Sequence, residues 1–163
     1  MQSKKIHKVS IVMGSQSDFK TMKLCQKVFK ILKVRLETKI ISAHRTPNRM
    51  YDYAKKAEKN KISVIIAGAG GSAHLPVMIA SLTAIPVIGV PIESKKLKGL
   101  DSLLSIAQMP KGVPVGTVAI GEDWAINAAL LAASIISLSD EKLKKNLNKW
   151  RVKQTFSVKK RPK

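Results

Sequence analysis

The sequence predicts an α/β protein in which one parallel sheet is covered by helices on both faces. Short apolar runs rich in valine and isoleucine alternate along the chain with longer segments whose apolar residues recur at helical spacing. Several of the apolar runs end in glycine, serine or proline, where a strand would turn into the next helix. Because alternating strands and helices favour parallel strands joined by helical crossovers, we expect three layers with the sheet in the middle.

Each predicted strand is an apolar run that is long enough to cross a sheet and is bounded by turn residues. KVSIVMG and ISVIIAGAG are typical of strands that helices cover on both faces, because they are apolar at nearly every position. The predicted strands cover 8–14, 34–42, 62–70, 85–91 and 113–120.

The predicted helices lie between and after these strands and carry apolar residues three and four positions apart. In the first of them, Cys25 shares a face with Met22, Phe29 and Leu32, so we assign this cysteine to the core and not to catalysis. An alanine-rich helix near the C-terminus is apolar on nearly every side, which requires burial in the core or between subunits. The predicted helices cover 17–32, 47–60, 74–82, 100–107, 122–138 and, as a final amphipathic helix, 140–154.

The length of 163 residues suits a single domain, 1–163, with a substantial core. A basic segment, 1–7, precedes the first strand, and we expect the basic tail from about 155 to 163 to be disordered. One cysteine excludes an internal disulfide and is typical of a reducing cytoplasm. The N-terminus has no signal-type apolar stretch and the longest apolar run is shorter than a bilayer span, so we expect a cytoplasmic protein that does not interact with membranes.

The formal net charge of +20 raises the question of nucleic-acid binding, because clustered lysine and arginine neutralise phosphates. The lysines are spread along several helices at three- and four-residue spacing, as on the solvated faces of amphipathic helices. With three Phe, two Tyr and two Trp, the chain has few side chains on which bases could stack. We therefore expect no nucleic-acid partner, and a basic surface that attracts a small anionic substrate.

In an open parallel sheet, ligands bind beyond the carboxyl ends of the strands, so the residues after each strand are the first candidates for a site. After the first strand, Gly14 permits a sharp turn, and Ser15, Ser17 and Asp18 stand where the next helix begins. The free N–H groups and partial positive charge of a helix N-terminus favour a phosphate, and Asp18 could accept from a ribose hydroxyl. The same residues would cap a helix without any ligand, so both interpretations remain open.

The second predicted strand ends in SAHRTP, which places Ser42, His44 and Arg45 just before a helix that begins at Pro47. Arg45 is suited to bidentate contact with a phosphate, and His44 can exchange protons near neutral pH. A single histidine at a strand end is often structural. Because serine, histidine and arginine occur together at the ligand-binding edge, a functional role for His44 is as well supported as a structural one.

The third predicted strand ends in AGAGGSAHLP, with His74 directly after the glycines. Gly70 and Gly71 permit close approach to the backbone, and successive N–H groups there can form an anion-binding nest. The segment also fits a loose dinucleotide fingerprint, which normally lies at the first strand–helix turn and has an acid about 20 residues later. Here it lies at the third turn and the nearest later acid is Glu93, so nicotinamide and flavin cofactors are not expected.

Other cofactor and metal motifs are absent from the sequence. No cysteine and histidine residues have zinc-site spacing, and no G-x-x-x-x-G-K-[ST] phosphate loop is present. We therefore expect neither a bound metal ion nor P-loop use of ATP.

Taken together, these strand ends resemble one family. IVMGSQSD, SAHRTP, IIAGAGGSAHLP, SIAQMPKGVPVGT and NAALLAA occur in this order, and the resemblance spans residues 8 to about 155. The chain is similar to class I PurE, the N5-carboxyaminoimidazole ribonucleotide mutases of purine biosynthesis, although Val77 and Trp124 stand where that family has smaller residues. The resemblance implies a flavodoxin-like or Rossmann-like three-layer fold with an extra C-terminal helix, a reaction without cofactors, and a homo-octamer.

The resemblance also implies a substrate and a reaction. The substrate is a nucleotide monophosphate that carries a carbamate on the exocyclic nitrogen of 5-aminoimidazole ribonucleotide, and the carboxyl group moves to ring carbon C4 through enclosed CO2. His44 matches the general acid and base of the family. The implied substrate-binding residues are Ser15, Asp18, Ser42, Arg45, Gly70, Gly71 and, in a supporting role, His74.

Two alternatives remain at this stage. An enzyme of the same fold could carboxylate aminoimidazole ribonucleotide directly with CO2, the class II activity, which shares the histidine and phosphate motifs. A basic, non-catalytic module that binds nucleotides or nucleic acids would show salt-sensitive binding to RNA or DNA and no turnover.

Overall fold

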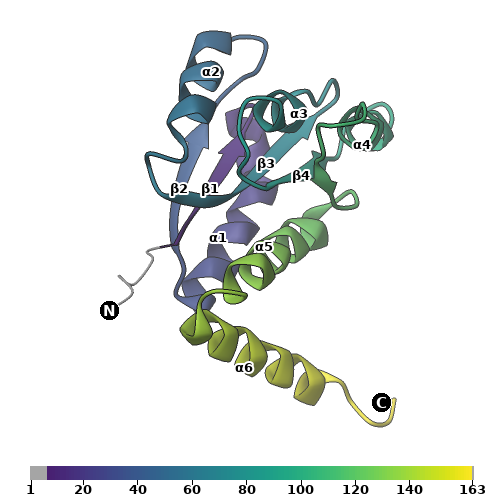
Figure 1. Cartoon of the computed structure of the whole chain (residues 1–163). Helices are drawn as coiled ribbons and strands as arrows, with labels where there is room; N and C mark the ends of the chain where they lie inside the picture. Colours follow the sequence, from purple (N-terminus) through teal and green to yellow (C-terminus); the bar gives the residue numbers. More distant parts are fainter. Residues whose placement is uncertain (1–6, 163) are drawn as a thin grey trace.

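The computed structural model describes residues 7–162. Its centre is a five-stranded parallel sheet with the strand order β2-β1-β3-β4-β5, the doubly wound order of flavodoxin-like folds (Figure 1). The predicted fold class is therefore confirmed. The strands are β1 (Lys8–Met13), β2 (Arg35–Ile40), β3 (Ile62–Gly70), β4 (Val87–Ile92) and β5 (Gly116–Thr117).

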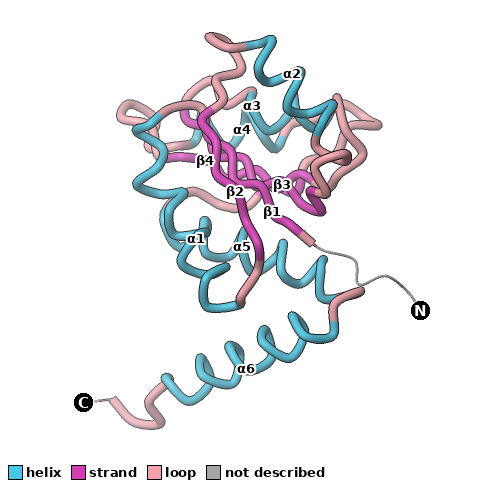
Figure 2. The backbone as a smooth tube through the Cα atoms, turned by 90° about the vertical axis from the view of Figure 1, so that its left-hand side faces the viewer, coloured by secondary structure: helices cyan, strands magenta, loops and turns pink. Residues whose placement is uncertain are grey.

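Helices cover both faces of this sheet, and Figure 2 shows the strands between the two helical layers. One layer contains α1 and α5, and the other contains α2, α3 and α4, because each group packs into its own apolar core. A short 3-10 turn (Gln16–Asp18) precedes α1. The helices are α1 (Phe19–Leu32), α2 (Pro47–Lys56), α3 (Leu75–Ala80), α4 (Leu100–Ala107), α5 (Glu122–Ser137) and α6 (Glu141–Ser157).

The central strand β1 shows how the sequence pattern produces the two cores. Successive side chains of a strand point to opposite faces of the sheet. Val9, Ile11 and Met13 therefore pack against α1 and α5, whereas Val12 packs beneath α2 and α3. All of these side chains are buried, as the apolar run predicts.

The fifth strand is much shorter than predicted. The sequence suggested a strand over 113–120, but β5 comprises only Gly116–Thr117 and pairs only with Ile88 and Gly89 of β4. No further strand lies outside β5 in the described part of the chain, and Pro114 has no N–H to donate. The short β5 also explains how Pro91 fits in β4, since nothing pairs with that end of β4 on the β5 side.

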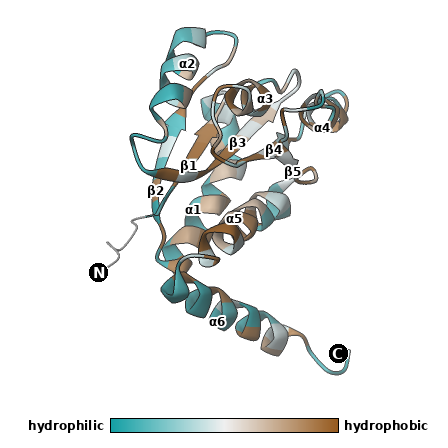
Figure 3. Cartoon of the chain, in the orientation of Figure 1, coloured by the Kyte–Doolittle hydropathy of each residue, from teal (hydrophilic) through white to brown (hydrophobic). Residues whose placement is uncertain are grey.

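The C-terminal helix α6 extends away from the body of the molecule (Figures 1 and 2). The Asp140 side chain caps it by accepting from the Leu143 amide at 2.9 Å, and Leu143 and Leu147 are buried against the core. Figure 3 shows that α6 is mainly hydrophilic, in contrast to the hydrophobic α5. The helix reaches Ser157, so the first residues of the predicted tail are helical.

At the other end of the chain, His7 is the only residue of the basic segment 1–7 within the described residues. Its Nδ1 lies 3.0 Å from the Ser63 hydroxyl and its Nε2 lies 3.3 Å from the Ser139 hydroxyl. His7 thus ties the start of β1 to β3 and to the end of α5. Of the helices that the structure describes, none has the length and hydrophobicity needed to cross a membrane.

Candidate active site

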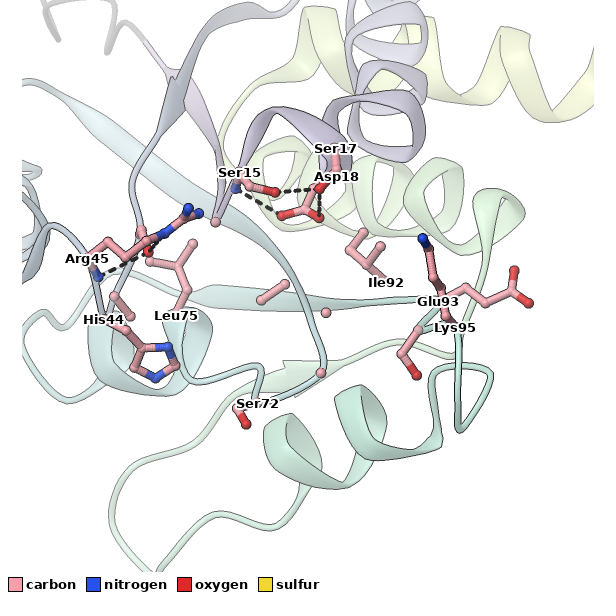
Figure 4. Close-up of a pocket in the computed structure, with 17 residues that line it drawn as sticks. Ser15, Ser17, Asp18, His44, Arg45, Ser72, Leu75, Ile92, Glu93 and Lys95 are labelled. Carbon is pink, nitrogen blue, oxygen red and sulfur yellow. Dashed lines mark hydrogen bonds between the residues drawn. The ribbon is translucent and has the colours of Figure 1, made fainter.

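A pocket of about 570 Å³ opens at the carboxyl ends of the first four strands, where the sequence placed its candidate residues. Four consecutive strand–helix connections meet there, so residues far apart in the chain share one cavity (Figure 4). The predicted residues among its lining are Ser15, Asp18, Ser42, His44, Arg45, Gly70 and Gly71.

The connection after β1 forms one wall and is held by its own side chains. The Asp18 carboxylate folds back and accepts a hydrogen bond from the Ser15 amide at 3.1 Å, which orders the turn into α1. The Ser15 and Ser17 hydroxyls are 2.6 Å apart. Burial raises the pKa of Asp18, and hydrogen bonds from these serines partly offset that rise. Asp18 therefore stabilises the turn that begins the helix, as the sequence allows, and it also lines the pocket.

The connection after β2 is held by a compact set of serine and threonine contacts. The Thr46 hydroxyl accepts from the Ser42 amide at 3.0 Å and donates to the Ser42 carbonyl at 2.9 Å. The Ser42 hydroxyl accepts from the amide of Arg45 at 3.2 Å and from its Nε at 3.4 Å. Ala43 is buried in the core below and anchors the loop. His44 and Arg45 are thereby left exposed toward the pocket.

His74 lies against His44 and is not among the residues that line the pocket. His44 Nε2 and His74 Nδ1 are 2.9 Å apart, and the two rings meet edge to face with centroids 5.0 Å apart. One of these two nitrogens must carry the proton of the hydrogen bond, so each ring restricts the tautomer of the other. The structure thus brings the two histidines together from connections 30 residues apart in the chain.

The glycines at the end of β3 and directly after it, Gly70 and Gly71, form the floor of the pocket, but their amides are not all available to a ligand. Gly71 adopts a left-handed conformation with φ of 64°, which favours glycine. Its N–H donates to the Ser102 hydroxyl at 2.8 Å, behind the pocket wall. The sequence predicts the Gly71 amide as part of an anion-binding nest, but this amide is hydrogen-bonded to Ser102 instead.

Sequence reasoning missed four polar residues that line the pocket. Ser72 continues the glycine turn, and Glu93, Ser94 and Lys95 follow the carboxyl end of β4. The rule that singled out the first three strand ends applies equally to the fourth, where ESKK follows the strand. Applied there, it would have identified this wall.

The described residues contain no group of three or more histidine, cysteine, aspartate or glutamate side chains placed to hold a metal ion. The polar side chains of the pocket are instead hydroxyls, a histidine, an arginine, a lysine and two carboxylates. This set can bind an anionic ligand and can exchange protons with it.

The chain is similar to known proteins over nearly its whole length. The model of the AIR carboxylase family matches residues 8–157. The chain is 54% identical to the N5-carboxyaminoimidazole ribonucleotide mutase of Escherichia coli over 155 residues, which cover 95% of this chain and 92% of that protein. It is also 54% identical to the enzyme of the same name from Brucella melitensis over 154 residues, covering 94% and 95% of the two chains.

Solved structures show the same relationship. The crystal structure of Treponema denticola PurE superposes with a TM-score of 0.84 at 27% sequence identity and covers 93% of each chain. The two chains therefore share their fold over nearly their whole length. By sequence and by structure, this chain belongs to the AIR carboxylase family.

Proposed function

We propose that this protein is an N5-carboxyaminoimidazole ribonucleotide mutase of purine biosynthesis, like the relatives to which it is 54% identical. The observation that carries the proposal is the position of His44. It is hydrogen-bonded to a second histidine and shares one pocket with an arginine and several hydroxyl groups. A proton-exchanging group beside donors suited to a phosphate is what a carboxyl transfer on a nucleotide monophosphate requires.

The substrate phosphate is bound by the connections after β1 and β2. Arg45 supplies the positive charge and the paired donors that a phosphate accepts. The Ser42 hydroxyl already accepts from Arg45, so its own proton is available to donate to the ligand. Ser15 adds a second hydroxyl at the start of α1, and Asp18 accepts from a ribose hydroxyl.

His44 moves the proton. When the carbamate N–CO2 bond breaks, the exocyclic nitrogen takes a proton from His44 and CO2 is released into the pocket. Ring carbon C4 then attacks CO2, and His44 takes the proton that C4 loses, so the enzyme ends each cycle in its starting state. His74 holds Nε2 of His44 and leaves Nδ1 for the substrate, which makes His74 a positioning residue.

The floor of the pocket suits a small apolar intermediate. Ala43, Ala69, Leu75 and Ile92 contribute apolar side chains next to Gly70 and Gly71, whose lack of side chains lets the imidazole ring come close to the backbone. Enclosure of CO2 by these groups would keep it near C4 and away from water.

The assembly in this proposal is a homo-octamer that works in the cytoplasm. Exposed apolar residues on and next to α6 support contact with other copies, since Leu138, Phe156 and Val158 are 88%, 83% and 73% exposed. Light scattering should give eight times the chain mass of 17.8 kDa. A monomer mass at low concentration would contradict the octamer.

The test of the function is conversion to the C4-carboxylated product without added ATP, metal or nicotinamide. The mutase converts N5-carboxyaminoimidazole ribonucleotide and does not need free CO2. Activity only with 5-aminoimidazole ribonucleotide and CO2 would instead identify the class II carboxylation. No turnover with either, together with salt-sensitive RNA or DNA binding, would favour the non-catalytic module.

A further inference from the structure

A buried hydroxyl behind the pocket joins the turn after β3 to the end of β4. Ser102, in the first turn of α4, is fully buried and does not line the pocket. Its Oγ accepts from the Gly71 amide at 2.8 Å and donates to the Ile92 carbonyl at 2.7 Å. Both hydrogen-bonding roles of the hydroxyl are therefore in use, and together they fix two strand ends to one point.

Asp101 extends this joint to the loop that follows β4. Its Oδ1 accepts from the Ser102 amide at 2.9 Å and from the Ser94 hydroxyl at 2.7 Å. Ser94 Oγ in turn accepts from the Gly99 amide at 3.1 Å, which closes the loop on itself. Gly71 and Ser94 line the pocket, whereas Asp101 and Ser102 do not. The hydrogen bonds through Asp101 and Ser102 therefore connect two walls of the pocket from outside the cavity.

We infer that Ser102 and Asp101 are positioning residues that hold the two pocket walls formed by the 70–73 and 93–99 segments at a fixed separation. They act through Gly71 and Ser94 and do not contact the substrate. Gly71 has a left-handed backbone, a conformation that glycine adopts freely, and its amide is directed at the Ser102 hydroxyl. The bond to Ser102 restricts that freedom and sets the shape of the floor on which the ligand rests.

Ser102→Ala removes the joint without removing any pocket residue. It leaves the Gly71 amide and the Ile92 carbonyl without their partner in a buried place, so both segments must shift to find new ones. Because small displacements of a binding surface are costly, we expect KM to rise by about tenfold or more. A smaller folded fraction would lower the apparent kcat and leave KM unchanged, so a rise in KM distinguishes positioning from simple destabilisation.

Asp101 provides a second pair of variants that does not depend on a fully buried site. Both donors meet the same oxygen, Oδ1, and the carbonyl oxygen of asparagine can accept them equally. Asp101→Ala should raise KM as Ser102→Ala does, whereas Asp101→Asn should restore most of the loss. Ser134→Ala is the matched control, because that serine donates to a carbonyl within α5, remote from the pocket.

The kinetic readout rests on the proposed function, so hydrogen exchange of the backbone amides supplies a second one that needs no substrate. Ser102→Ala and Asp101→Ala should accelerate exchange in both the 70–73 and 93–99 segments, and Ser134→Ala in neither. If the wild type lacks mutase activity, the proposed function fails and the exchange result alone decides the inference. Unchanged exchange in either segment, or a KM equal to that of the wild type in an active enzyme, would overturn it.

Discussion

A methyl group added at Gly68 is expected to overpack the contact between β3 and α1. A Cβ built at this glycine would overlap Met22 Sδ and would lie 2.9 Å from its Cγ and 3.0 Å from its Cε. Met22 is fully buried, so its side chain can move only by displacing other core residues. Overpacking of this kind costs about 1–3 kcal/mol. For a chain of this size, that corresponds to a fall in Tm of about 2–12 °C.

Urea unfolding at a fixed protein concentration measures this cost, and Gly116→Ala is the control. Gly116 is also a strand glycine, but the nearest atom to its added Cβ is 3.6 Å away, so that variant should remain close to wild type in stability. Met22→Ala alone should cost about 2–5 kcal/mol because it opens a cavity. In the double variant the new methyl occupies part of that cavity, so the loss of stability in the double variant should be smaller than the sum of the two single losses. Strictly additive costs, or wild-type stability for Gly68→Ala, would show that the Gly68 position is not overpacked by a methyl group.

Three further predictions follow from the ionisable groups. Burial raises the pKa of Asp18, so protonation of its carboxylate should raise KM as the pH falls into the acid range. Asp18→Asn should remove this acid-dependent rise in KM. A rise that persists in the variant would argue against the contact between Asp18 and the ribose. Burial raises the pKa of Cys25 to about 12, so a soluble disulfide reagent should label this thiol at neutral pH only as the protein unfolds, and faster labelling would contradict the core assignment. For Glu37, burial is outweighed by hydrogen bonds and attraction from two lysines, which lower its pKa. The stability that this carboxylate contributes is therefore present above its ordinary pKa and is lost as the pH falls through the lowered one, so Glu37→Gln should be less stable than wild type at neutral pH and equal to it in acid. A stability difference that is independent of pH would exclude this role.

The sheet and its helices could be predicted from the sequence because the signals were local. The apolar run of β3 and the helical spacing of Met22, Cys25 and Phe29 need no knowledge of the rest of the fold. The length of β5 could not be predicted in this way. Its end depends on how far a neighbouring strand offers partners, and only Ile88 and Gly89 do so.

The candidate site shows the same division. Ser42, His44 and Arg45 follow a strand, and the rule for parallel sheets places such residues at one edge. The contact between His44 and His74 depends on the relative position of two connections, which no spacing reveals. Ser102 was not singled out because a serine within a helical pattern has no local mark of its role; only the folded chain shows that its hydroxyl meets Gly71.

Conversion of N5-carboxyaminoimidazole ribonucleotide by His44→Asn decides whether His44 transfers the proton during carboxyl migration. Asparagine is polar and smaller than histidine, so it fits the same space, but it cannot take up and release a proton near neutral pH. We expect wild-type turnover without added ATP, metal or nicotinamide, and a loss of about 100-fold or more in kcat for the variant, with the fold intact. Turnover that survives in His44→Asn would contradict the assignment and would move the proton transfer to another group, with His74 as the next candidate.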